Sequence, residues 1–183
     1  MYFDMYGPFD VGRPEGQVAP SQTAMWAEVR KKCRSYNYEE LELEQGIGCY
    51  AFGLRWGDTL TPWYVGMTIA KGGFRREVFH LHKRDHYNAV LAAHRGTPVM
   101  FLMPLMTEQM RFSRDRSGSE TLIQWVEKLL FGAALRRNLD CRNQRDTRFL
   151  REVVVNGLFN SAGPGRPERG AAAARRMFGM EGG

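Results

Sequence analysis

The sequence predicts an α+β protein built on a small three-stranded antiparallel sheet that is flanked by helices. Three short runs, rich in aromatic and β-branched residues and separated by turn residues, predict the strands: Cys49 to Leu54, Trp63 to Met67 and Thr97 to Leu105. Apolar residues recur at helical spacing in residues 74–94 and again from Ser119 to about Leu135. The order strand, strand, helix, strand, helix is typical of a compact α+β domain.

Residues 1–45 are expected to form an arm and a helix that pack on this core. The first part, residues 1–20, is interrupted by prolines and glycines and is predicted to be irregular. Ser21 is a candidate cap for a helix from Gln22 to Cys33. The next two strands pair most simply as an antiparallel hairpin with a loop of about eight residues.

The rest of the core follows Gly72 and Gly73. Residues 74–94 are expected to form two helical segments with a bend near residues 80–85, before the third strand and the last helix complete a core of residues 46–140. Residues 141–183 form a basic extension, in which residues 148–155 fit either a helix or a strand. The tail from about residue 161 is rich in Gly, Pro, Ala and Arg and is expected to be mobile.

The composition is that of a folded, soluble chain. Of the 183 residues, 43% are hydrophobic and 25% are charged, which excludes a disordered chain. The longest apolar run, Pro98 to Met106, has only the length of a strand, so no membrane span is expected. The first residues do not resemble a secretory signal. The three cysteines are widely spaced, which argues against a disulfide framework or a zinc knuckle and predicts a cytoplasmic protein.

The positive charge is concentrated near the end of the chain. From Arg136 onward there are ten arginines, no lysine and five acidic residues, so this segment carries +5 of the net charge of +6. A clustered excess of arginine is typical of a surface that binds a phosphate backbone. A solvated basic tail is an equally good interpretation of charge alone.

Two short motifs stand beside each other in the predicted hairpin. Gly48-Cys49-Tyr50 lies on the first strand and Tyr64-Val65-Gly66 on the second, and an arginine-bearing helix, a strand and a glutamate-bearing helix follow. This order resembles the GIY-YIG nuclease superfamily over about residues 46 to 140, and the whole chain looks like a bacterial branch of it. The resemblance implies the compact α+β fold predicted above.

The resemblance also implies a metal-dependent endonuclease that hydrolyses phosphodiester bonds in DNA. It implies Mg²⁺ or Mn²⁺ as the cofactor, bound by Glu127 on the last core helix. It makes Tyr50 the base and lets Tyr64 position water or phosphate. Arg76 contacts the phosphate, and His80, one helical turn later, shares or takes over the base role.

Further residues have supporting roles under the same resemblance. Arg75 competes with Arg76 for the phosphate, and the basic residues expected to bind nucleic acid are Arg75, Lys83, Arg84, Arg136 and Arg137. The residues that support the site are Gly48, Gly66 and Asn138.

These residue types suit the chemistry. A guanidinium such as that of Arg76 can hold two phosphate oxygens at once. A tyrosine is a poor base at its usual pKa near 10, but beside a cation and a metal-bound water its pKa should fall. Glu127, expected at the edge of the apolar stripe of its helix, can hold a divalent ion that polarises the phosphate.

Other interpretations remain open at this point. Tyr50 shares a strand face with Phe52 and Leu54, so it can equally be a buried hairpin tyrosine. His82 and His86 lie one turn apart, a weak indication of zinc because no cysteine is near. Glu77 can neutralise the neighbouring arginine. The alternative functions are a nucleic-acid-binding module that does not cut and, less favoured, a protein-interaction domain.

Overall fold

The computed structural model describes residues 2–13, 22–35, 40–142, 173–174 and 177. The chain divides into two compact units, Met1–Asn143 and Gln144–Gly183. Almost all described residues belong to the first unit, and of the second only Ala173, Ala174 and Met177 are described, all helical. The expectations for residues 148–155 and for the tail from about residue 161 therefore lie outside the described residues.

The first unit contains strands and helices in α+β order, as predicted. The strands are β1 (Tyr2–Phe3), β2 (Tyr6–Asp10), β3 (Gly48–Trp56), β4 (Thr59–Thr68) and β5 (Thr97–Met106). The helices are α1 (Gln22–Ser35), α2 (Glu40–Gln45), α3 (Gly73–Glu77), α4 (Leu81–Ala93) and α5 (Glu120–Arg137).

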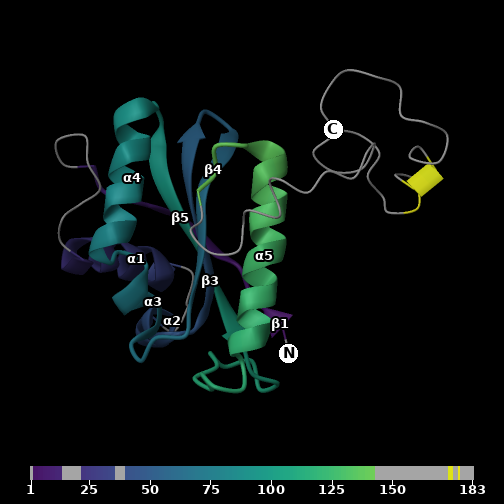
Figure 1. Cartoon of the computed structure of the whole chain (residues 1–183). Helices are drawn as coiled ribbons and strands as arrows, with labels where there is room; N and C mark the ends of the chain where they lie inside the picture. The colour runs from purple at the N-terminus through teal and green to yellow at the C-terminus, as the bar shows by residue number, and fades with distance from the viewer. Residues whose placement is uncertain (1, 14–21, 36–39, 143–172, 175–176, 178–183) are drawn as a thin grey trace. The chain divides into compact units, whose positions relative to one another are not determined.

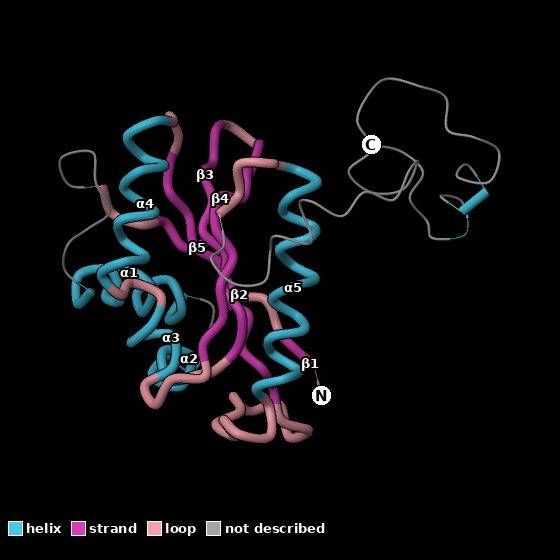
Figure 2. Tube along the Cα trace, viewed as in Figure 1, coloured by secondary structure: helices cyan, strands magenta, loops and turns pink. Residues whose placement is uncertain are grey.

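The sheet is antiparallel and has five strands, not the three that the sequence predicted. Strand β3 lies between β4 and β5, as Figure 2 shows, and both β1 and β2 pair with β5. The arm expected to be irregular therefore contains two strands. Its residues Tyr6 and Phe9 bury their side chains in the main core, which explains why a segment rich in glycine and proline still docks on the sheet.

The hairpin is also tighter than predicted. Strands β3 and β4 continue to Trp56 and Thr59, which pair with each other, so Gly57 and Asp58 alone form the turn. Gly57 has a φ of 56°, a conformation that glycine adopts without strain. The register shifts between Phe52 and Gly53, opposite Trp63, where a bulge accommodates the neighbouring Pro62.

Helices cover both faces of the sheet (Figure 1). Helices α1, α3 and α4 lie on one side and α5 lies on the other. Side chains of β3 alternate between the two: Tyr50 and Phe52 belong to the cluster that includes Trp26 of α1 and Tyr87 of α4, whereas Cys49 packs with Ile123 of α5. The two faces of the sheet thus belong to separate cores.

The helical stretch after β4 is interrupted where α3 ends and α4 begins. His80 precedes α4 with φ −57° and ψ 149°, so the chain leaves the helical conformation there, at the start of the region predicted to bend. The last helix begins after Ser119 and ends at Arg137, close to its predicted limits. Among the described helices, none combines the length and the apolar character that crossing a membrane requires.

The buried carboxylate of Glu44 connects helices α1, α2 and α3. Glu44 of α2 is only 1% exposed, and its Oε1 accepts a hydrogen bond from Nη1 of Arg30 of α1 at 2.6 Å. Nη1 of Arg75 of α3 lies 3.4 Å from the other oxygen. Because a buried charge is costly without partners, this pairing constrains how α3 sits on α1 and α2.

Arg30→Met should therefore lower the stability of the protein. The substitution leaves the buried Glu44 with the more distant Arg75 alone, and we expect the free energy of unfolding to fall by about 3 kcal/mol. Urea denaturation followed by circular dichroism measures this change. Lys31→Met, at an exposed position of the same helix, is the matched control, and equal losses in the two variants would contradict the role given to Glu44.

Candidate functional site

The two tyrosine motifs form one packing unit. Tyr50 pairs directly opposite Gly66, and the rings of Tyr50 and Tyr64 stack with centroids 6.1 Å apart at 24°. A Cβ at Gly66 would lie 2.7 Å from Cζ and Oη of Tyr50 and 2.9 Å from Cε1 of Tyr64. Gly66 is thus the residue that leaves room for both rings. Gly48, with a φ of 150°, similarly permits close contact with the Met103 carbonyl of β5.

Tyr50 is fully buried and chemically unlike an ordinary core tyrosine. Its hydroxyl is enclosed, and among the described residues it has no partner with hydrogen-bond geometry, although Tyr64 is a close polar neighbour. Burial, followed by the influence of Tyr87, Tyr64 and Glu77, raises the pKa of Tyr50 well above its usual 10. This shift is opposite to the fall expected beside a cation and a metal-bound water, and it keeps the Tyr50 hydroxyl protonated at pH 7.

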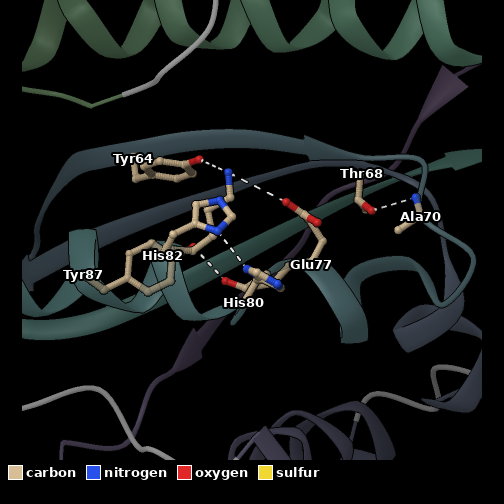
Figure 3. A network of polar contacts seen from close by, with 9 residues as sticks. Tyr64, Thr68, Ala70, Glu77, His80, His82 and Tyr87 are labelled. Atoms are coloured by element: carbon tan, nitrogen blue, oxygen red, sulfur yellow. Dashed lines mark hydrogen bonds and ion pairs between the residues drawn. The ribbon is translucent and has the colours of Figure 1, made fainter.

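Tyr64 is paired with Lys83, one of the basic residues expected to bind nucleic acid. Its Oη accepts a hydrogen bond from Nζ of Lys83 at 2.6 Å, and the same ammonium lies 3.7 Å from Oε1 of Glu77 (Figure 3). Lys83 is only 13% exposed. Because its oxygen accepts a hydrogen bond from Lys83, the hydroxyl hydrogen of Tyr64 can be donated to another acceptor.

Aromatic and imidazole rings enclose Tyr64. His86 stacks on it with centroids 5.9 Å apart, and Tyr87 meets it edge-on at 5.7 Å while donating a hydrogen bond to the Val78 carbonyl at 2.9 Å. Desolvation lowers the pKa of His86 below 6.5, and the nearby cations lower it further. His86 is therefore neutral at pH 7.

His80 and His82 form a pair at the start of α4. Their Nδ1 atoms are 2.8 Å apart, so one nitrogen carries a hydrogen and the other accepts the hydrogen bond. Desolvation, with Lys83 and His80, lowers the pKa of His82, so His82 is neutral at pH 7. The predicted one-turn relation between Arg76 and His80 is wrong, because α3 ends at Glu77 and the chain turns before His80.

The structure separates the two competing arginines. Arg75 is engaged by Glu44 at 3.4 Å. Arg76 is exposed and forms no ion pair with any residue that the structure describes. Glu77 turns toward Lys83 and does not neutralise Arg76, contrary to one of the sequence-based interpretations. Arg76 is the arginine available to a ligand.

Glu127 lies on the other side of the sheet from the tyrosines. It is half-buried on α5. Burial raises the pKa of Cys49, and the charge of Glu127 raises it further, whereas for the buried Tyr50 and Tyr87 the acid that adds to the effect of burial is Glu77. In the part of the chain that the structure describes, no group of three His, Cys, Asp or Glu side chains could hold a metal ion. The residues therefore do not fit a magnesium or manganese ion held by Glu127 beside the tyrosines, and they do not fit a zinc site at His82 and His86.

The segment after α5 returns to the edge of β4. Asn138 ends α5 and donates from Nδ2 to the Pro62 carbonyl at 2.8 Å. Cys141 is buried, and Arg142 donates its backbone N–H to Trp63 at 2.8 Å and bridges to Tyr64. Arg142 belongs to the basic segment that begins at Arg136, and no local pattern in the sequence indicates its pairing with Tyr64.

The other expected cationic residues differ in exposure. Arg84 is half-buried, and its Nε is enclosed without a partner among the described residues. Arg136 and Arg137 are exposed in the last turn of α5, on the opposite layer from Lys83. The cations of α4 and those of α5 therefore lie in different layers and do not form one cluster.

Tyr50→Phe should leave the protein at least as stable as the wild type. The substitution removes a buried hydroxyl that has no hydrogen bond, so we expect the free energy of unfolding to stay unchanged or to rise by up to about 1 kcal/mol. Tyr87→Phe is the matched control, since it removes a hydrogen bond to Val78 and should cost about 1 kcal/mol. The measurement is urea denaturation of both variants. A larger loss for Tyr50→Phe than for Tyr87→Phe would show that the Tyr50 hydroxyl is paired.

Acidification should destabilise the protein partly through His86. Its pKa is lower in the folded than in the unfolded protein, so between these two values the unfolded chain binds more protons and stability falls as the pH falls below about 6.5. His86→Gln should lose less stability than the wild type between pH 7 and pH 5. Thermal unfolding of both proteins across this pH range tests the direction of the change in stability. Equal losses of stability in the wild type and in His86→Gln would contradict the prediction.

The chain matches no protein-family model, no curated protein and no solved structure.

Proposed function

We propose that this chain binds the phosphodiester backbone of nucleic acid and hydrolyses it, as an endonuclease of GIY-YIG type that acts on DNA. The observation that carries the proposal is the pairing of the Lys83 ammonium with the Tyr64 hydroxyl at 2.6 Å, which places a cation and a hydroxyl donor side by side at the second tyrosine motif. A cation beside an oriented hydroxyl is an arrangement that can hold a phosphate oxygen.

The cations near the tyrosines support a phosphate as the ligand. Arg76 is exposed and has no ion pair among the described residues, so its planar guanidinium can bind two phosphate oxygens. Tyr64 can donate its hydrogen to a third oxygen while Lys83 supplies positive charge behind it. Arg76, Tyr64 and Lys83 thus provide directed donors and charge for a group that becomes more negative during hydrolysis.

Water activation falls to the histidine pair in this proposal. His82 is neutral at pH 7, and its contact with His80 lets the pair accept a proton from an attacking water and share it. Tyr50 remains protonated and positions Tyr64 by stacking on it. This reassigns the base role that the family resemblance gives to Tyr50.

A divalent ion enters the proposal only through the family resemblance. When bound, Mg²⁺ or Mn²⁺ would polarise the phosphate and stabilise the leaving oxygen. Since Glu127 lies across the sheet from Tyr64, no step is assigned to an ion at that residue. Glu77 is the carboxylate on the same side as the tyrosines.

A nucleic-acid-binding module that does not cut is the second candidate. The position of Glu127 and the complete burial of Tyr50 favour it, because a water molecule cannot reach a fully enclosed hydroxyl. Arg76, Lys83 and the other basic residues would then bind the nucleic-acid backbone without cutting it, with an affinity that falls steeply as the salt concentration rises.

Cleavage of plasmid, branched and single-stranded DNA, with Mg²⁺ or Mn²⁺ against a chelator, tests the proposal. We expect Arg76→Ala and His80→Ala each to slow cleavage by about 100-fold. Arg95→Ala, at an exposed position between α4 and β5, is the matched control and should cut normally. Glu127→Gln and Glu77→Gln show which carboxylate the reaction needs.

The outcomes separate the two candidates. DNA binding without cleavage under any condition would favour the binding module. Cleavage that survives in Arg76→Ala and His80→Ala would mean that the site is wrongly placed. A chain that neither binds nor cuts any of the nucleic acids would contradict both candidates.

A further inference from the structure

The return segment after α5 holds Arg142 in a fixed place beside the candidate site. Asn138 and Cys141 anchor the segment, the first by its hydrogen bond to Pro62 and the second by complete burial. The backbone of Arg142 then donates to Trp63 at 2.8 Å. Three consecutive constraints of this kind leave the Arg142 backbone little freedom, although its side chain is exposed.

The bridge between the segment and β4 decides where the Arg142 side chain points. Arg142 and Tyr64 form a parallel bridge, and bridged residues on neighbouring strands direct their side chains to the same face of a sheet. Tyr64 faces α4, so Arg142 does so as well. Consistent with this placement, the Arg142 charge is the largest electrostatic influence that lowers the pKa of His86 on α4.

Positive charge and hydrogen-bond donors therefore meet around Tyr64. Lys83 contacts its hydroxyl, His86 stacks on its ring, and Arg142 extends from the edge of β4 toward the same face. The acidic neighbours are Glu77, 3.7 Å from Lys83, and Asp85 near His86. Glu77 offsets Lys83, which leaves the Arg142 guanidinium as the exposed cation of this group.

We propose that Arg142 adds a second phosphate-binding position, beside His86 and next to the one that Arg76, Tyr64 and Lys83 provide, so that a nucleic-acid strand contacts the protein at two phosphates along the edge of β4. This inference rests on the proposed function and adds to it a residue outside the expected core of residues 46–140. The substrate it implies is a polynucleotide long enough to reach both positions, rather than a mononucleotide.

The two arginines come from separate segments of the chain. Arg142 follows α5 and pairs with β4, whereas Arg76 lies on α3 next to Glu77, whose carboxylate is 3.7 Å from Lys83. In this proposal each guanidinium binds its own phosphate of the strand.

The test measures binding of a fluorescent oligothymidylate by anisotropy, in the presence of a chelator, over a series of salt concentrations. Each phosphate that a cation neutralises on a single strand contributes about 0.7 to the slope of log K against log salt. We expect Arg142→Ala to weaken binding and to reduce the slope by about 0.7. Arg142→Lys should keep the slope, because an ammonium also neutralises a phosphate. Arg95→Ala is the matched control.

Two further readouts make the result decisive. The backbone bonds of Arg142 persist in Arg142→Ala, so its urea midpoint should equal that of the wild type, and the His86 pKa measured by NMR should rise. If Arg142→Ala keeps the wild-type slope while Arg76→Ala reduces it, the second position is wrong and the proposed function stands. If the wild-type chain does not bind the oligonucleotide at all, both are wrong.

Discussion

The contact between Tyr50 and Gly66 is the constraint on which the rest of the site depends. A glycine opposite the tyrosine lets the Tyr50 ring lie across β4 and stack on Tyr64. Any side chain at position 66 would push the two rings apart. The position of Tyr64 in turn determines where Lys83 can reach its hydroxyl and where His86 can stack on its ring. A single pair of residues in the hairpin register thus positions groups from α4 as well.

The break between α3 and α4 completes this arrangement. A continuous helix would keep Glu77 and Lys83 six residues apart along one axis, with their side chains on different faces. The turn at His80 brings the carboxylate to within 3.7 Å of the ammonium. The same turn places His80 against His82. The sequence indicates that a bend occurs there, but only the backbone conformation shows which side chains it joins.

Local patterns were sufficient for the fold class and insufficient for the site. Periodicity and turn residues predicted β3, β4, β5 and the long last helix, since those signals act within a few residues. They did not predict β1 and β2, whose pairing depends on burying Tyr6 and Phe9 against a strand far along the chain. The pairing of Lys83 with Tyr64 and of Arg142 with β4 is equally non-local. Spacing along the sequence does not indicate such long-range contacts.

The two glutamates illustrate how much a three-dimensional placement changes the chemistry. Spacing alone selects Glu127, because it lies on a strong amphipathic helix at a suitable distance in sequence from the tyrosines. The sheet, however, separates the two faces into different cores, and a strand is too densely packed for a carboxylate to act through it. Glu77 lies on the face of Tyr50 and Tyr64, where its charge already reaches both Lys83 and the tyrosines. Of the two, Glu77 is therefore the acid whose charge acts on the groups around Tyr64.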